Sequence, residues 1–324
     1  MTDNNIEKVL IIGSGPAGWT AALYTARATL TPLVYEGSAP NLPGGQLMIT
    51  SDVENYPGFP EGVLGPELME KFKAQAERFG ARVVTENIAS VDFNQRPFVA
   101  TSESGTEIKA HTVIIATGAN AKLLGIDKEK EIIASGAGVS ACATCDGAFY
   151  KDVDVAVVGG GDSAMEEANF LTRYAKSVTI IHRREGFRAS KIMVDRAQNN
   201  PKIKWELNQE VAELLTEKQG IMNNDTLVAV KTKNTQTGEE KEIPFQGLFV
   251  AIGHSPTTGL FKDYLSFDDK GYIKTLGQSA KTEIEGVFAC GDVQDSYYRQ
   301  AITASGSGCM AAIDAERYLE GKGL

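Results

Sequence analysis

The pattern strand, glycine loop, helix occurs twice in this chain, and this repeat constrains the fold more than any other feature. The apolar run Val9–Ile12 is followed by GSGPAG at Gly13–Gly18 and then by a helix-like segment. In the same way, Val153–Val158 is followed by GGGDSA at Gly159–Ala164. Such a loop turns tightly and lets a pyrophosphate approach the backbone at a helix N-terminus. The repeat therefore predicts an α/β protein with two doubly wound, Rossmann-like nucleotide-binding domains.

The residues that end the next strand differ between the two repeats. Pro32–Tyr35 is followed by Glu36, where an acid is expected to bind a ribose hydroxyl and to disfavour a 2′-phosphate. At the same spacing in the second repeat, Val178–Ile181 runs into HRR at His182–Arg184. Arginine forks bind phosphate bidentately, so the first domain is predicted to bind FAD or NAD and the second NADPH. The alternatives are a structural glycine turn and a solvated basic turn.

A pair of cysteines lies just before the second repeat. In ACATCDG at Ala141–Gly147, Cys142 and Cys145 form a C-x-x-C pair that is followed by Asp146. Such a pair can cycle between dithiol and disulfide, and a neighbouring carboxyl group can carry the proton. The alternatives are half of a zinc site and two inert cysteines. A zinc site needs four ligands, and the remaining cysteines and histidines are scattered, so we predict a redox pair and no metal.

The composition limits the size and the partners of the protein. A chain of 324 residues is expected to form about two domains. Its net charge of −10 argues against nucleic acid and anionic membranes as partners. No apolar run approaches the length of a membrane span, and the polar start MTDNNIEK gives no sign of a signal peptide.

Two apolar strands that each end near a glycine are expected to flank an inserted domain. The segment Gly247–Gly253 echoes TVIIATG at Thr112–Gly118. The chain is therefore predicted to leave the first domain after one strand and to return to it with the other. The first domain is predicted at residues 1–117 and 246–324, and the inserted domain, with the cysteine pair, at residues 118–245.

Further elements follow from hydrophobic periodicity and composition. We expect one strand over Ser90–Thr101, a helix that starts at Met165 and a long helix over Tyr298–Tyr318. The Gly- and Pro-rich segment Asn41–Gly65 is predicted to form a long ordered loop over a ligand. Asp292, which follows a strand and a glycine, is expected either to bind the ribityl chain of a flavin or to cap a turn.

Together these motifs resemble those of the low-molecular-weight thioredoxin reductases. These flavoproteins pass electrons from NADPH through FAD to a C-x-x-C disulfide and then to thioredoxin. The resemblance covers almost the whole chain and rests on GSGPAG, GGQL, VENYPGFP, ATG, ACATCDG, GGGDSAMEEA, HRR with FRAS, AIGH, GDV and RQAITASGSGCMAA. It implies a cytoplasmic homodimer with thioredoxin-disulfide reductase activity, in which Cys142 and Cys145 are the redox pair and Asp146 handles the proton.

The resemblance also implies which residues contact the cofactors. FAD contacts are expected at Gly13, Ser14, Gly15, Pro16, Ala17, Glu36, Gly37, Gly45, Gln46, Leu47, Asn55, Thr117, Gly118, Gly291, Asp292, Arg299, Gln300 and Ala301. NADPH contacts are expected at Gly160, Gly161, Asp162, Ser163, His182, Arg183, Arg184, Arg188, Ile252 and Gly253.

The sequence shows no second dithiol that could carry electrons to the surface. One pair must therefore be reduced at the flavin and then reach a protein disulfide. A rotation of the NADPH domain between the half-reactions would meet both needs, with hinges near Thr117–Ala119 and Pro244–Gly247.

Two residues differ from the family pattern, and two other functions are possible for such a sequence. Trp19 stands where the family has a smaller aromatic residue or His, and Cys290 stands where Ala is common. One rival is a related flavin-dependent disulfide reductase with another donor or acceptor, such as a ferredoxin-dependent enzyme or the flavoprotein of a peroxide-reducing system. The other is a non-enzymatic redox sensor, which would not consume NADPH catalytically.

Overall fold

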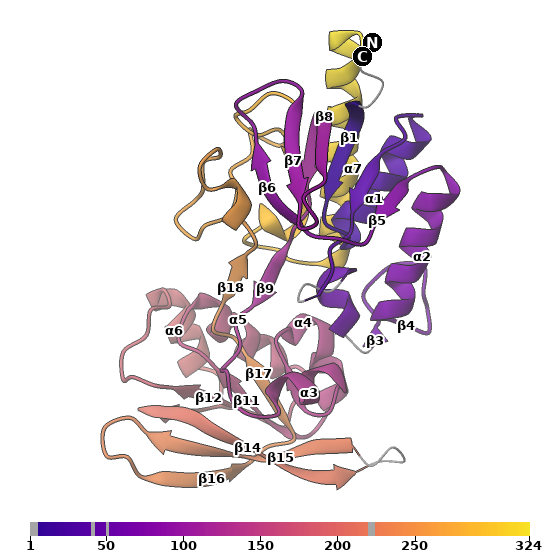
Figure 1. The fold of residues 1–324 in the computed structure, drawn as a ribbon. Coiled ribbons are helices and arrows are strands. Elements are labelled where there is room, and N and C mark those ends of the chain that lie inside the picture. The colour runs from indigo at the N-terminus through magenta and orange to yellow at the C-terminus, as the bar shows by residue number, and fades with distance from the viewer. Residues whose placement is uncertain (1–5, 40–42, 50–51, 220–223) are drawn as a thin grey trace. The chain divides into compact units, whose positions relative to one another are not determined.

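The chain forms two structural units in the computed structural model, which describes residues 6–39, 43–49, 52–219 and 224–324 (Figure 1). The first unit consists of Met1–Asp52, Tyr56–Asn120 and Ser255–Leu324. The second consists of Val53–Asn55 and Ala121–His254. The expected loop over residues 41–65 includes residues 41–42 and 50–51, which lie outside the described ranges.

The first unit is built on a mostly parallel sheet in which a central strand is paired on both sides. Its order is β5 (Arg82–Val84), β2 (Leu33–Tyr35), β1 (Ile6–Ile12), β8 (Glu107–Ile115), β7 (Phe98–Ser102) and β6 (Ile88–Asp92), with β19 (Val287–Ala289) also beside β8. The strand β1 pairs in parallel with β2 and β8, with Leu10 opposite both Leu33 and Val113. The continuous apolar run of β1 fits a strand that is covered on both faces.

Three helices of this unit pack together. The helix α1 (Pro16–Arg27) contacts both α2 (Gly65–Arg78) and α7 (Ala301–Lys322) (Figure 1). A Cβ atom on Gly308 would lie 2.2 Å from the backbone oxygen of Ala17, so only glycine allows α7 to approach α1 this closely. Another part of the core joins Phe93 and Phe98 to Phe261 and Leu265.

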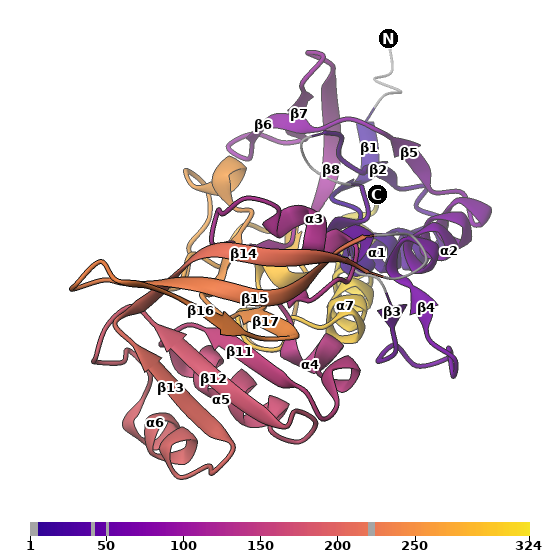
Figure 2. The same ribbon diagram turned by 90° about the horizontal axis from the view of Figure 1, so that it is seen from below.

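The second unit is a parallel sheet covered on both faces. Its order is β10 (Val139–Ser140), β17 (Gly247–Val250), β11 (Asp154–Val158), β12 (Ser177–His182) and β13 (Ile203–Leu207). The helices α5 (Asp162–Leu171) and α6 (Lys191–Gln198) lie on one face, and the antiparallel strands β14 (Gln209–Gln219), β15 (Asn224–Asn234) and β16 (Glu240–Pro244) lie on the other (Figure 2). Successive side chains of β11 point to opposite faces of the sheet. Val155 and Val157 pack in the hydrophobic cluster with α5. Ala156 and Val158 pack in the cluster with β14 and β15 on the other face.

The shorter elements complete the chain. They are β3 (Asp52–Val53), β4 (Val63–Leu64), β9 (Ala119–Ala121), β18 (His254–Pro256), α3 (Glu129–Ala134), α4 (Ala143–Asp146) and the 3₁₀ segments Gly45–Ile49, Gly147–Tyr150, Gly259–Phe261 and Gly291–Val293. The strands β9 and β18 pair with each other where the chain passes between the units. No described helix is both long and apolar enough to cross a membrane.

The predicted fold class is confirmed, and several bounds differ from the expectation. The expected strand over residues 90–101 is the pair β6 and β7, separated by a turn in which Asn94 N donates to Asp92 Oδ1 at 2.9 Å. The helix expected to start at Met165 already starts at Asp162, directly after the glycine loop.

The two units also differ from the predicted domain limits. Residues 246–254 belong with the second unit, because β17 pairs with β11 from Val155↔Gly247 to Val158↔Val250. The likeness of Gly247–Gly253 to Thr112–Gly118 therefore marks equivalent strands of two similar units. It does not mark a return to the first unit.

Candidate redox and nucleotide sites

The C-x-x-C pair forms a disulfide at the start of a short helix. Cys142 and Cys145 are bonded, with their Cα atoms 5.3 Å apart. Cys142 is the extended residue that precedes α4, and its carbonyl accepts hydrogen bonds from Cys145 N and Asp146 N. Both sulfur atoms are used in this bond, so the pair does not act as half of a zinc site in this state. The described part of the chain contains no cluster of three His, Cys, Asp or Glu residues suited to a metal ion.

A half-buried carboxyl group follows the disulfide. Burial raises the pKa of Asp146 above its ordinary value of 3.8, and a hydrogen bond with Ser140 partly offsets this. Burial, together with the charge of Asp146, raises the pKa of Tyr150 to about 12. The Oγ atom of Ser140 also accepts a hydrogen bond from Cys142 N at 3.0 Å. The carboxyl group thus has a shifted pKa and shares a hydroxyl partner with the cysteine backbone, which suits a group that holds a proton during thiol chemistry.

Replacing Asp146 by Asn is expected to remove a pH-dependent loss of stability. Since the pKa of Asp146 is raised in the folded state, its stabilising effect is fully present below the unfolded pKa and is lost as pH rises through the folded pKa. Between these two values, the stability of Asp146→Asn relative to the native chain should rise by up to about 1.4 kcal/mol per pH unit, the limit for one proton. Urea unfolding at several pH values from 4 upward measures this difference.

The matched control is Asp152→Asn, which changes an exposed carboxylate of the same unit. It should give no such pH-dependent gain. A native chain and Asp146→Asn variant with parallel stability–pH curves would contradict the assigned burial of this carboxyl group.

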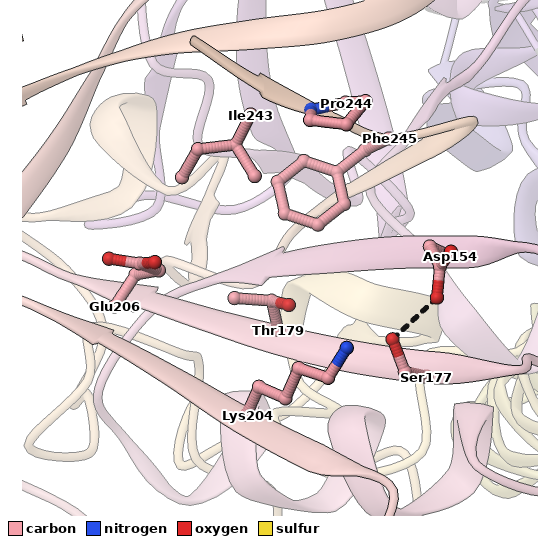
Figure 3. Close-up of a pocket in the computed structure, with 8 residues that line it drawn as sticks. All are labelled: Asp154, Ser177, Thr179, Lys204, Glu206, Ile243, Pro244 and Phe245. Carbon is pink, nitrogen blue, oxygen red and sulfur yellow. Dashed lines mark hydrogen bonds between the residues drawn. The ribbon is translucent and has the colours of Figure 1, made fainter. Parts of the chain in front are cut away.

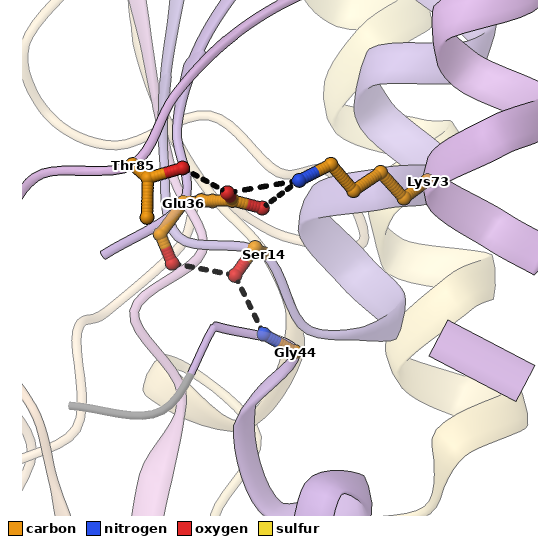
Figure 4. A network of polar contacts seen from close by, with 5 residues as sticks. All are labelled: Ser14, Glu36, Gly44, Lys73 and Thr85. Atoms are coloured by element: carbon orange, nitrogen blue, oxygen red, sulfur yellow. Dashed lines mark hydrogen bonds and ion pairs between the residues drawn. The ribbon is translucent and has the colours of Figure 1, made fainter. Parts of the chain in front are cut away.

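The glycine loop of the first unit leaves an open space at the N-terminus of α1. Gly13 adopts φ +112° and a Cβ atom there would lie 2.2 Å from the backbone oxygen of Ala116, so this position requires glycine. At Gly15, in contrast, the nearest atom to an added Cβ atom is Gly44 O at 3.9 Å. The hydroxyl of Ser14 holds the loop in place, since it donates to Glu36 O at 2.6 Å and accepts from Gly44 N at 2.8 Å (Figure 4). A backbone with this open face and free helix N–H groups fits a pyrophosphate.

Glu36 lies where the sequence predicts the ribose-binding acid, but it already has two polar partners. It follows β2 and its side chain is buried. Lys73 Nζ lies 2.8 Å from Oε2, and Thr85 Oγ1 donates to Oε1 at 2.5 Å (Figure 4). No sequence motif indicates Lys73 or Thr85 as a partner of Glu36, because nothing near either residue in the sequence links it to this acid.

A second acid of the first unit lacks one expected partner. Burial, followed by the charge of Asp295, raises the pKa of Asp292 to about 7, while Arg299 lowers it. Its Oδ1 atom is buried and makes no hydrogen bond with any residue that the structure describes. Buried oxygens are nearly always paired, so a donor such as a ligand hydroxyl is expected here. A Cβ atom on the preceding Gly291 would lie 2.7 Å from that of Ala17, which places this turn beside the start of α1.

Several of the other predicted FAD contacts form hydrogen bonds with residues of the chain. Gln46 donates to Asn120 Oδ1 at 2.9 Å, and Thr117 Oγ1 donates to Thr257 O at 2.7 Å. Gln300 takes part in a capping box with Thr303 at the start of α7. Asn55 is grouped with the second unit, so the structure does not relate it to the glycine loop of the first. The remaining predicted contacts lie on the loop, on the segment Gly45–Ile49 or beside these residues.

The second glycine loop is open at Gly161 and filled at Gly160. No atom lies within 4 Å of a Cβ atom added to Gly161, the residue that precedes α5. At Gly160 an added Cβ atom would lie 2.2 Å from the ring of His182. His182 is buried, stacks on Phe187 with centroids 5.3 Å apart, and its Nε2 lies 3.1 Å from Gly186 O. His182 therefore supports the loop from within the unit.

Three arginines lie close to this loop. Arg188 N donates to Gly160 O at 2.8 Å, which folds the segment after HRR back onto the loop. Arg183, Arg184 and Arg188 are exposed and form no salt bridge with the described residues. Burial lowers the pKa of His182, a hydrogen bond with Gly186 partly offsets this, and the charges of the three arginines lower it further. Exposed guanidinium groups beside an open glycine loop fit an anionic nucleotide.

The further predicted contacts of the second unit also lie near its loop. Asp162 Oδ1 accepts hydrogen bonds from the backbone N and the hydroxyl of Ser190, which joins the loop to the start of α6. Gly253 adopts φ +102° after β17, and Ser163 lies in the first turn of α5.

A separate pocket of the second unit contains none of the predicted site residues. It has a volume of about 250 Å³ and lies between β11–β13 and the end of β16 (Figure 3). Its wall consists of Asp154, Ser177, Thr179, Lys204, Glu206, Ile243, Pro244 and Phe245. Asp154 accepts a hydrogen bond from Ser177 at 2.6 Å.

A C-x-x-C disulfide in one of two Rossmann-like units, each with an open glycine loop, defines a two-nucleotide disulfide oxidoreductase. The chain belongs to the pyridine nucleotide-disulphide oxidoreductase family, whose profile matches residues 7–308.

Several relatives of this chain are named thioredoxin reductases. The chain is 53% identical to the thioredoxin reductase of Streptomyces clavuligerus over 316 residues, which cover 98% of this chain and 95% of that one. It is 52% identical over 314 residues to the bifunctional thioredoxin reductase/thioredoxin of Mycobacterium leprae, covering 97% of this chain and 66% of that one. Its fold is similar to the crystal structure of thioredoxin reductase from Streptococcus pyogenes, with a TM-score of 0.88, 41% identity, and coverage of 98% of this chain and all of that one.

Proposed function

We propose that this protein is an NADPH-dependent thioredoxin-disulfide reductase. The observation that carries the proposal is the Cys142–Cys145 disulfide, held in the unit with the arginine-rich glycine loop. The names of the relatives support thioredoxin as the protein substrate. One of them is named as a bifunctional thioredoxin reductase/thioredoxin. We further propose a cytoplasmic homodimer with no nucleic acid or membrane partner.

FAD is proposed to bind the first unit. The residues of this unit fit FAD. Gly15 leaves the loop open to a pyrophosphate, and the buried Glu36 lies at the position expected for an acid that binds a ribose hydroxyl. The buried Oδ1 atom of Asp292 has no hydrogen-bond donor among the described residues. NADPH is proposed to bind the second unit at Gly161 and the three arginines. When bound, FAD supplies the two-electron chemistry that connects a nicotinamide to a disulfide.

The residues of the chain carry the disulfide chemistry. Reduction of the Cys142–Cys145 bond takes up two electrons and two protons and yields two thiols. The thiolate of Cys142 is proposed to attack the thioredoxin disulfide and form a mixed disulfide, which the Cys145 thiolate then resolves. This returns the bond between Cys142 and Cys145 and releases reduced thioredoxin. Asp146 is proposed to supply or hold the proton that the thiols exchange.

A rotation of the second unit between half-reactions is proposed because one cysteine pair must serve two reaction partners. The described chain contains only two further cysteines, the buried Cys290 and the half-buried Cys309, and they do not form a second C-x-x-C pair. The hinges are now proposed at the strands β9 and β18, where the chain passes between the units. The hinge expected near Pro244–Gly247 is less suitable, because Gly247 pairs with Val155 inside a sheet.

Replacing Arg183 and Arg184 by Gln is expected to weaken NADPH use selectively. Each lost charge-assisted contact to the 2′-phosphate should cost about 1.5–3 kcal/mol, so KM for NADPH should rise by roughly tenfold or more per arginine. KM for NADH should change little, because NADH lacks this phosphate. Flavin reduction measured with each cofactor gives the result.

Arg196→Gln is the matched control, since Arg196 is an exposed arginine in α6 of the same unit. It should leave both KM values unchanged. Equal losses with NADPH and NADH in the Arg183 and Arg184 variants would exclude a role in 2′-phosphate recognition.

An anaerobic titration tests the whole proposal. The purified protein should be yellow, should lose its visible flavin absorption when NADPH is added, and should then reduce thioredoxin with turnover. A ferredoxin-dependent relative would not be reduced by NADPH. A redox sensor would be reduced once but would not turn over with thioredoxin.

A further inference from the structure

A cluster of polar side chains in the first unit joins the predicted ribose-binding acid, which is buried, to a lysine of helix α2. We propose that Lys73 is a positioning residue for the dinucleotide site, which orients the Glu36 carboxylate toward the adenosine ribose of FAD. This inference rests on the proposed FAD site, and it names a residue that the glycine-loop motif does not contain.

The ion pair holds the carboxylate of Glu36 at both of its oxygens. Lys73 Nζ lies 2.9 Å from Oε1 and 2.8 Å from Oε2 of Glu36, so one ammonium group bridges both oxygens (Figure 4). Thr85 Oγ1 donates to Oε1 as well. Two donors therefore fix the plane of the carboxylate, one from α2 and one from the residue after β5.

One of the two carboxylate oxygens keeps an acceptor position for a further hydrogen bond. Each carboxylate oxygen can accept about two hydrogen bonds. Oε1 accepts from both Lys73 and Thr85, whereas among the described residues Oε2 accepts only from Lys73. The open acceptor position on Oε2 is thus available to a ribose hydroxyl, and Lys73 and Thr85 determine which oxygen it is.

The acid of this ion pair is buried. The side chain of Glu36 is 5% exposed and that of Lys73 is 34% exposed. A buried carboxylate without its counter-charge is strongly destabilised, whereas an exposed ion pair contributes little. The pair is therefore more than a surface contact.

Trp19 explains how Lys73 is held. The indole of Trp19 is buried on α1, directly after the glycine loop, and Lys73 Nζ lies 5.8 Å from its ring centroid. An ammonium group at this distance from an indole is attracted to the ring. The large aromatic residue at this position thus provides a second contact for the lysine that orients Glu36.

The test is a comparison of FAD binding by full-length variants from which the flavin has been removed. Binding is measured by the loss of flavin fluorescence during titration. Lys73→Met should weaken FAD binding about tenfold or more, and Lys73→Arg should restore most of it because the charge is kept. In a Glu36→Gln background, Lys73→Met should add little, because the carboxylate that Lys73 orients is already gone.

An FAD analogue that lacks the adenosine ribose hydroxyls separates positioning from a general structural role. If Lys73 acts through Glu36 on these hydroxyls, Lys73→Met should weaken the binding of this analogue far less than that of FAD. Equal losses with FAD and the analogue would overturn the proposal, as would normal FAD binding by Lys73→Met.

Lys71→Met is the matched control, since Lys71 lies on the same helix and forms an exposed ion pair with Glu67. It should bind FAD as the native chain does. Urea unfolding of each flavin-free variant shows whether the chain is folded. A native chain that binds no FAD would refute the proposed function itself, and this outcome is distinct from failure of the Lys73 variants alone.

Discussion

A Cys145→Ser variant is expected to lose thioredoxin reduction entirely while NADPH still bleaches its flavin. Hydride transfer belongs to the cofactors, whereas exchange with thioredoxin needs both sulfur atoms. Cys142 alone can form a mixed disulfide with thioredoxin but has no neighbouring thiolate to resolve it. Serine differs from cysteine by one atom, and Cys145 lies in the short helix α4, so the unit should keep its fold.

Two measurements separate the half-reactions in this variant. Rapid mixing with NADPH under anaerobic conditions follows the flavin spectrum, and a steady-state assay follows thioredoxin reduction. The control is Cys309→Ser, which removes a half-buried free cysteine of α7 and should leave both reactions intact. Normal thioredoxin turnover by Cys145→Ser would show that the pair is not the route of the electrons.

The second large effect is expected from two alanine substitutions in the first glycine loop. One should prevent folding, and the other should prevent FAD binding. Gly13→Ala should prevent folding of the first unit. Its Cβ atom would lie 2.2 Å from Ala116 O, at a backbone φ of +112° that side chains rarely adopt. The obstacle is backbone, and Ala116 N is itself bonded to Ile12 O, so relief would separate β1 from β8. A loss of more than about 4 kcal/mol is expected, which is large against the stability of a typical domain.

Gly15→Ala should instead give a folded protein without FAD. Its backbone φ is −71°, which alanine adopts readily, and the nearest atom to the new methyl group is 3.9 Å away. The methyl group would stand where the pyrophosphate is expected to approach the backbone. Circular dichroism and urea unfolding report the fold of both variants, and the visible spectrum reports their flavin content. A Gly15→Ala protein with full flavin content would contradict the proposed FAD site.

The sequence determined those features that depend on neighbours along the chain. A strand that must be buried on both faces shows as the apolar run before Gly13, and the tight turn that follows demands glycine because no side chain fits. Two residues between Cys142 and Cys145 bring the sulfur atoms within reach of each other in one turn of helix. These local constraints were sufficient to predict the repeated α/β fold and the position of the redox pair.

Only the tertiary structure decided which distant side chains share a site. Lys73 meets Glu36 because α2 packs beside α1, and no periodicity links these two positions. His182 was expected among the phosphate contacts, but the fold packs its ring beneath Gly160, because the segment after β12 turns back onto the loop. The strand β17 resembles β8 in sequence. Only its pairing in the structure, such as that with β11, shows that it belongs to the second unit. Sequence patterns record burial and backbone sterics, whereas contacts between elements depend on how those elements pack in space.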